Sequence, residues 1–286
     1  MTNKTEFRLP SGLSHSAVSS YATCGEQFRL ERVYRLKGPP SWALLGGKAV
    51  HSITEILDLN ELGAGQPVPT FEEMLNRLIA EECERAKIKV DAIKPTGRAS
   101  KEWPNKRDRD WWLHHGPGFV DAWVEWREEY DWELLTMPDG MPAIELDLET
   151  EVAGRKFRGY LDRAYVKPTG EIIVVDLKTG KSPGSYLQLG TYRLAMKLRY
   201  GLDVPLGAYW LAETGLLTED IDLTVFTDEY MTNLYAMAGR GIDAQVFMPN
   251  TNAFCSSCAV RPFCRAKGGL LVNNVPITEF SEDSSS

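Results

Sequence analysis

The chain has 286 residues, of which 43% are hydrophobic and 25% are charged, and its net charge is −8. This composition is typical of a globular protein with room for one large domain or two small ones. It argues against a protein covered in nucleic-acid-binding surface, although a local basic groove or a bound metal can overcome the acidic balance. No apolar run approaches the length of a membrane span, and the first residues lack an apolar signal region. We therefore expect a cytoplasmic protein without a membrane partner.

The first predicted helix begins at Ser14, a plausible N-cap residue. After it, Val18, Tyr21, Cys24 and Phe28 recur at helical spacing. This pattern predicts that Cys24 lies on the buried side of the helix.

A second helix is predicted from about residue 46 to residue 61. His51 lies beside its apolar stripe, and Glu55 follows one turn later. Taken alone, His51 fits either a partly buried helix residue paired with Glu55 or a functional group.

Two longer helices are predicted over residues 70–87 and 107–132, separated by a polar, exposed loop at 88–105. The second helix is expected to break or kink near Gly116-Pro117-Gly118. Tryptophans on this helix lie near basic residues and could stack on single-stranded bases. We favour the alternative that they pack the helix against a sheet. These tryptophans are Trp111, Trp112, Trp123, Trp126 and Trp132.

A sheet is predicted from residue 143 onward. Residues 144–149 alternate apolar and acidic, as in a half-exposed strand. Runs at 157–166 and 171–177 flank the turn-forming sequence 167–170, which is the pattern of an antiparallel hairpin. An α/β sheet with helices on its faces is therefore expected. The remaining predicted elements are a crossover at 179–184, helices at 186–200 and 228–245, and strands at 206–212 and 221–226.

The hairpin carries charged residues at positions that suggest chemistry. Asp162 lies in its first strand, and Asp176 and Lys178 lie at the end of its second. Strand alternation points Asp176 and Lys178 to the same side. If Asp162 converges on them, two carboxylates can hold Mg²⁺ or Mn²⁺, and Lys178 can orient or deprotonate a bound water, as phosphodiester hydrolysis requires. The alternative is a structural Asp176–Lys178 salt bridge, with Asp162 simply exposed.

Three of the five cysteines form the pattern C-x2-C-x5-C at Cys255, Cys258 and Cys264. A C-x2-C pair can bind one metal ion or cluster, because the intervening turn brings both sulfurs to the same side. A fourth ligand must come from elsewhere in the chain. Cys83 lies in an amphipathic helix and is expected to be a small core residue. Spacing alone fits both a four-thiolate zinc site and an iron–sulfur cluster.

Several motifs occur in the chain in a specific order. They are the first-helix residues 13–16 with Tyr21, Cys24 and Phe28, a histidine motif at 47–51, a first acidic motif at 159–162, a D-x-K motif with its Thr-Gly sequel at 176–180, a Q-x3-Y motif at Gln188 and Tyr192, and the cysteine pattern. Together they resemble the RecB-like nucleases of the PD-(D/E)XK superfamily that have a split four-cysteine iron–sulfur site, as in CRISPR-adaptation exonucleases. Asp176 stands where many members of the superfamily have Glu, and residues 70–132 match no motif of the family.

This resemblance implies a restriction-endonuclease-like core, in which helices flank a central mixed sheet, with an N-terminal helical region and a C-terminal cysteine cluster. Lys178 would stabilise the attacking water or the scissile phosphate, and Gln188 and Tyr192 would position DNA. The implied ligands of the catalytic Mg²⁺ or Mn²⁺ are His51, Asp162, Asp176 and the Leu177 backbone carbonyl. The implied ligands of a 4Fe-4S cluster are Cys24, Cys255, Cys258 and Cys264.

We therefore predict a metal-dependent DNA nuclease, specifically an exonuclease acting on single-stranded DNA ends. No G-x4-G-K-[ST] motor motif is present, so duplex DNA would have to be opened by a partner, such as a helicase or a recombination or CRISPR-adaptation protein. Recombination, repair and phage DNA metabolism all use such domains. The alternative is an iron–sulfur DNA-binding accessory protein in which cleavage is dispensable. The predicted segments are an N-terminal helical region (1–142), a nuclease core (143–226), a C-terminal helix with the cysteine segment (227–271) and a disordered tail (272–286).

Overall fold

The computed structural model describes residues 8–269, 271–272 and 275–276. The chain divides into two compact units. We call residues 39–148 and 160–227 the central unit, and residues 8–38, 149–159 and the described residues from 228 onward the terminal unit. Most of the predicted disordered tail, 272–286, lies outside the described residues.

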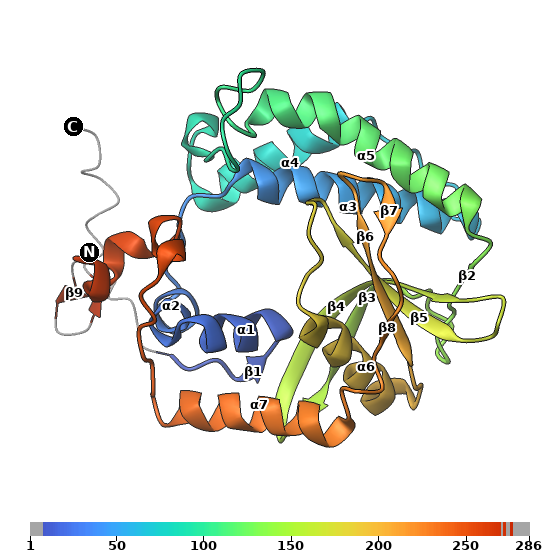
Figure 1. Cartoon of the computed structure of the whole chain (residues 1–286). Helices are drawn as coiled ribbons and strands as arrows, with labels where there is room; N and C mark the ends of the chain where they lie inside the picture. The colour runs from blue at the N-terminus through green and yellow to red at the C-terminus, as the bar shows by residue number, and fades with distance from the viewer. Residues whose placement is uncertain (1–7, 270, 273–274, 277–286) are drawn as a thin grey trace. The chain divides into compact units, whose positions relative to one another are not determined.

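The central unit is built on a mixed β-sheet (Figure 1). β5 (Ile172–Lys178) pairs antiparallel with β4 (Arg155–Val166), as the hairpin pattern predicts. It pairs parallel with β6 (Leu206–Leu211), because α6 (Tyr186–Tyr200) carries the chain back between them. The further strands are β2 (Glu133–Leu134), β3 (Ile144–Val152), β7 (Leu216–Leu217) and β8 (Ile221–Asp222).

Three of these short strands differ from the prediction. The predicted strand at 221–226 is only the two residues of β8, and the sequence predicts neither β2 nor β7. β3 and β4, which pair with each other, contribute residues to both units. The predicted α/β class, with a central mixed sheet flanked by helices, is confirmed.

Helices cover both faces of this sheet. Residues Ile173, Val175 and Leu177 of β5 belong to the main hydrophobic core, which one group of helices completes. Asp176 points to the opposite face, where α6 contacts it. The alternation of β5 thus separates an apolar side from a side that carries charge. The helices that complete the core are α3 (Trp42–Glu61), α4 (Phe71–Ala86) and α5 (Arg109–Glu129) (Figure 1).

The tryptophans of α5 pack helix against sheet, as favoured from the sequence. Trp123 contacts Trp210 of β6 with ring centroids 5.0 Å apart, and Trp126 contacts Tyr165 of β4. The helix does not break at Gly116-Pro117-Gly118, because α5 runs through residues 116–118, and a kink there stays a prediction. Gly116 instead permits close packing. A Cβ atom there would lie 2.1 Å from the ring of Phe71.

The first predicted helix is divided in the structure. α1 (His15–Thr23) ends at Cys24, whose backbone is extended, and α2 (Gly25–Phe28) follows. Gly25, the first residue after this division, is in close contact with a distant segment: a Cβ atom on it would lie 2.8 Å from the backbone nitrogen of Met248. Cys24 is therefore half-buried at the junction of two helices, and the prediction that it lies on the buried side of one continuous helix is wrong.

The terminal unit also contains short strands and single helical turns. None of the helices in the described part of the chain is both long and apolar enough to cross a membrane. The other elements of this unit are β1 (Gly12–Leu13), a π-helix (Arg29–Val33), α7 (Asp228–Asp243), the 3-10 helices Ala253–Ser256, Arg261–Phe263 and Arg265–Lys267, and the paired β9 (Leu271–Val272) and β10 (Val275–Pro276).

Candidate active site

The candidate site lies where β4 and β5 stop pairing. Their paired residues run as far as Arg163 opposite Val175. Beyond that point the backbone N–H of Leu177 donates to Oδ2 of Asp162 at 2.8 Å, because a buried N–H that has no strand partner needs another acceptor. Asp162 is only 8% exposed. The alternative in which this aspartate is simply exposed is therefore wrong.

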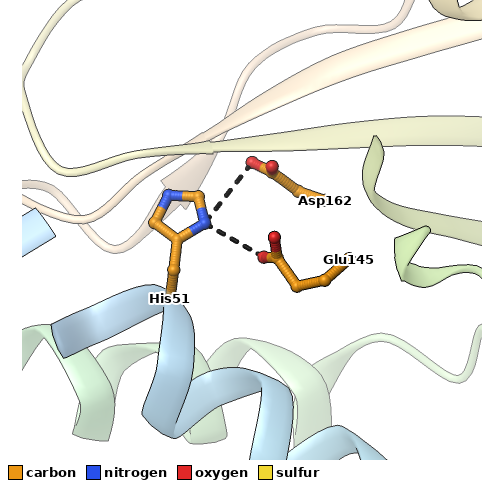
Figure 2. A group of neighbouring side chains, drawn as sticks. All are labelled: His51, Glu145 and Asp162. Carbon is orange, nitrogen blue, oxygen red and sulfur yellow. Dashed lines mark hydrogen bonds and ion pairs between the residues drawn. The ribbon is translucent and has the colours of Figure 1, made fainter. Parts of the chain in front are cut away.

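A histidine and two carboxylates gather at this point (Figure 2). His51 Nδ1 lies 3.1 Å from Glu145 Oε1 and 3.8 Å from Asp162 Oδ2. One ligand atom from each residue lies within 4.8 Å of the other two. The ring of His51 faces these acids, which come from β3 and β4. His51 therefore contacts Glu145 and Asp162 instead of forming the pair with Glu55 that the sequence offered as one alternative. One imidazole nitrogen and two carboxylate oxygens form a donor set that suits Mn²⁺ or Mg²⁺.

Asp176 forms a second cluster beside this group of three, together with residues of α6. Its Oδ2 lies 2.5 Å from Lys178 Nζ, and its Oδ1 accepts hydrogen bonds from Gln188 Nε2 at 2.7 Å and from the Tyr192 hydroxyl at 3.3 Å. Lys178 also donates to Gln188 Oε1 at 3.1 Å. All seven sequence-predicted residues of the catalytic site thus lie in the central unit. The Leu177 carbonyl as a ligand stays a prediction.

Burial and neighbouring charges perturb the ionisation of the groups in both clusters. Burial, together with the nearby charge of Asp176, raises the pKa of Asp162 to about 7. Burial also raises the pKa of Asp176, against the opposing effect of the Lys178 ammonium. For His51, burial lowers the pKa, but the carboxylates of Asp162 and Glu145 outweigh it and raise the value to about 9. Carboxyl groups whose pKa values are perturbed by burial and by neighbouring charges are common at functional sites.

A buried arginine contacts two residues of the site. Arg163, next to Asp162 in β4, is 1% exposed and forms an ion pair with the equally buried Asp58 of α3. The same guanidinium donates to Glu145 Oε1 at 3.2 Å and to the backbone carbonyl of Asp162 at 2.6 Å. Asp58 also accepts a hydrogen bond from the indole N–H of Trp123. Arg163 therefore connects an acid of the site to the helix core.

The sequence did not identify Glu145 as a site residue. It belongs to the alternating run 144–149, in which Asp147 and Glu149 carry the same charge at equivalent positions. Its one distinguishing signal was that its strand precedes the one that carries Asp162. The structure adds a feature that no pattern predicts, a left-handed backbone at Glu145 with φ of +44°. Such a conformation is costly for a residue with a Cβ atom and is often found at functional positions.

The pKa shifts predict how pH changes the stability of the metal-free protein. Between pH 3.8 and about pH 7, Asp162 carries a proton in the folded protein but has lost it in the unfolded chain. The stability that protonated His51 contributes to the folded protein is fully present below pH 6.5, and it is lost as the pH rises through about 9. Both groups therefore make the metal-free protein less stable as the pH rises. A divalent cation offsets the charge of the ionised, buried carboxylates, so its stabilising effect should increase with pH.

We expect the gain in Tm from Mn²⁺ over EDTA to be larger at about pH 8.5 than at about pH 6, by roughly 5 °C. Thermal unfolding across this range measures it. In Asp162→Asn, which cannot ionise at this position, the gain in Tm from Mn²⁺ should vary less with pH. A gain that does not vary with pH in the wild-type protein would contradict the assignment of the cation to this group.

The four cysteines of the predicted cluster lie together in the terminal unit. They line one cavity of about 310 Å³. Asn250 connects the two ends of the set, because its backbone N–H donates to Cys24 Sγ at 3.4 Å and its carbonyl lies 4.0 Å from Cys255 Sγ. Burial raises the pKa of the Cys258 thiol. The fifth cysteine, Cys83, packs against the core of the central unit, as expected.

The mixed sheet brings together two aspartates and a lysine where the pairing of β4 and β5 ends, and this arrangement is the one expected of a nuclease fold with a D-x-K motif. The chain belongs to the PD-(D/E)XK nuclease superfamily, whose family model matches residues 12–265. The restriction-endonuclease-like core expected from the sequence is thereby confirmed.

Relatives of similar length occur in mycobacteriophages. The Gene 69 protein of Mycobacterium phage D29 is 32% identical over 281 residues, which cover 91% of this chain and 98% of the relative. The Gene 69 protein of Mycobacterium phage L5 is 29% identical, with coverage of 88% and 95%. A solved structure from Eubacterium rectale, named as a candidate exonuclease, superposes with a TM-score of 0.47 at 14% identity and covers 96% of this chain and 94% of its own.

Proposed function

We propose that this chain is a metal-dependent deoxyribonuclease that removes nucleotides from single-stranded DNA ends. The observation that carries the proposal is the meeting of His51, Glu145 and Asp162 next to the Asp176–Lys178 pair. A protein that only binds DNA has no need of a buried carboxylate beside a second buried acid that raises its pKa, because burying charge is unfavourable. Membership of a nuclease superfamily supports the same conclusion.

The residues of the site divide the chemistry between them. A bound Mn²⁺ or Mg²⁺ supplies an acidified water and offsets charge on the phosphate. His51, Glu145 and Asp162 would hold the ion, with Asp176 completing the site from the α6 side. Lys178 is held by Asp176 and Gln188, so its ammonium can stabilise the developing charge on a phosphate oxygen.

Gln188 and Tyr192 have a role besides any contact with DNA. Both donate hydrogen bonds to Oδ1 of Asp176, and Gln188 also donates to the Tyr192 hydroxyl at 2.9 Å. We infer that they fix the orientation of the Asp176 carboxylate. Hydrogen bonds of this kind around a ligand typically change metal affinity or activity by about 10- to 100-fold.

The test compares linear and circular single-stranded DNA in the presence of Mn²⁺. An exonuclease releases mononucleotides from labelled linear strands and leaves circles intact, whereas an endonuclease cuts both. DNA binding without release of nucleotides from any substrate would instead support the accessory-protein alternative. Substrates labelled at the 5′ or the 3′ end establish the polarity.

We also propose that Cys24, Cys255, Cys258 and Cys264 hold a 4Fe-4S cluster. Their position around one cavity of the terminal unit supports this proposal, and zinc bound by the same thiolates is the alternative. Such a site would join segments more than 200 residues apart in sequence, which constrains the unfolded chain.

Anaerobically purified protein is then expected to be brown, with about four irons and four sulfides per chain. Cys258→Ser should lower the iron content and the Tm together, because an incomplete ligand set binds the cluster weakly. Cys83→Ser is the matched control, since Cys83 lies in the central unit and should leave the iron content unchanged. A colourless protein with a single zinc ion would rule out the cluster.

The phage relatives suggest a biological setting. We infer that the chain acts on DNA in the cytoplasm of a bacterial host, in phage recombination or repair. A helicase, recombination or CRISPR-adaptation partner that opens duplex DNA stays a prediction from the sequence.

A further inference from the structure

The segment 94–107 of the central unit is a basic loop in an acidic protein. It contains five basic residues against the single acid Glu102, in a chain with a net charge of −8. Residues Arg98, Lys101 and Lys106 are exposed, and within the described part of the chain no acidic side chain pairs with them. The remaining basic residues of the loop are Lys94 and Arg107. Its positive charge is thus available to an external partner.

The loop is held in a defined conformation despite its exposure. Its neck is closed by a bridge between Thr96 and Arg107, with a hydrogen bond of 3.0 Å from Arg107 N to Thr96 O. Trp103, in the middle of the loop, packs against the core, with its ring centroid 5.4 Å from that of His114. Arg98, Lys101 and Lys106 are therefore presented from a fixed base, so less conformational freedom is lost when they bind.

Both ends of the loop are connected to elements of the candidate active site. Arg107 forms a bidentate ion pair with Glu213, with contacts of 2.7 and 3.3 Å. The residue before Glu213, Ala212, donates its backbone N–H to the carbonyl of Lys178 at 2.9 Å. At the other end, Lys94 bridges to Ser41, the N-cap of the helix that carries His51. The base of the loop is thus attached to the same strand end and the same helix as the site.

We propose that Arg98, Lys101 and Lys106 bind the phosphodiester backbone of single-stranded DNA that is engaged in the active site. This inference rests on the proposed nuclease function and assigns a role to a segment that matches no motif of the family. Cations on flexible side chains contact phosphates without reading bases, so the expected binding is independent of sequence and sensitive to salt.

The test is the salt dependence of DNA binding, measured by fluorescence anisotropy in EDTA so that no cleavage occurs. For Arg98→Gln/Lys101→Gln/Lys106→Gln we expect the slope of log Kd against log salt concentration to decrease by about 2, because each lost phosphate contact on a single strand contributes about 0.7. The charge-retaining variant Arg98→Lys/Lys101→Arg/Lys106→Arg should keep the wild-type slope. Lys197→Gln, which removes one positive charge from an exposed position on α6, should also keep the wild-type slope.

Cleavage assays separate this proposal from the function on which it rests. In Mn²⁺, the neutral triple variant should have a raised KM for single-stranded DNA and an unchanged rate on bis(4-nitrophenyl) phosphate, a small diester that does not reach the loop. An unchanged salt slope in the neutral triple variant, or an equal loss in the charge-retaining variant, would overturn the proposal for the loop. A different result is a wild-type protein that shows the expected salt slope of DNA binding, and its loss in the neutral triple variant, yet hydrolyses neither substrate. That result would refute only the nuclease function.

Discussion

Lys178→Met is expected to lower kcat for DNA hydrolysis by about 10²- to 10³-fold while leaving Mn²⁺ binding largely intact. The Lys178 ammonium contacts Asp176 and Gln188 but is not a metal ligand, so its loss removes stabilisation of the developing charge on the phosphate without removing the cation site. Asp162→Asn should differ, because it removes a charged ligand and should weaken Mn²⁺ binding as well as catalysis.

Single-turnover cleavage and calorimetric titration with Mn²⁺ measure the two quantities separately. Lys197→Met is the matched control, because it removes the same charge from an exposed position on α6 and should retain wild-type kcat and metal affinity. If Lys178→Met cleaves DNA as fast as the wild-type protein, the salt bridge to Asp176 is structural and the proposed mechanism is wrong.

Arg163→Met is expected to lower the free energy of unfolding by about 3–5 kcal/mol, because it leaves the Asp58 carboxylate buried without its partner. Each of these side chains is 1% exposed, so water cannot replace the lost contact. Burial raises the pKa of Asp58, and the Arg163 guanidinium opposes that shift. In the variant, Asp58 should therefore take up a proton, and part of the lost free energy is the cost of protonating this carboxyl group.

The double variant Asp58→Asn/Arg163→Met is the control for this interpretation. Asparagine removes the charge and keeps an acceptor for the indole N–H of Trp123, so the double variant should be more stable than Arg163→Met alone. Urea unfolding of the metal-free proteins gives the four values of the double-mutant cycle. Additive losses would show that the two side chains do not act as a pair.

The short-range patterns of the sequence predicted the region around the site well. The turn at 167–170 and its flanking strands predicted the β4–β5 hairpin, and alternation correctly placed Asp176 and Lys178 on one side of β5. These inferences depend on neighbouring residues and on a fixed period, which a sequence displays directly. The division of the first helix at Cys24 does not follow from such a pattern, and the segment that packs against Gly25 there, at Met248, is distant in sequence.

By itself the sequence determined the fold class, the family resemblance and the identity of most groups in the candidate site, because these follow from local periodicity and from motif order. Only the tertiary structure decided which acid faces His51, since Glu145 lies 94 positions away and resembles its neighbours in the strand. The same holds for Arg163 and Asp58, which are 105 positions apart and meet only through the packing of α3 on the sheet. Contacts of this range depend on how whole elements dock, and no local pattern encodes them.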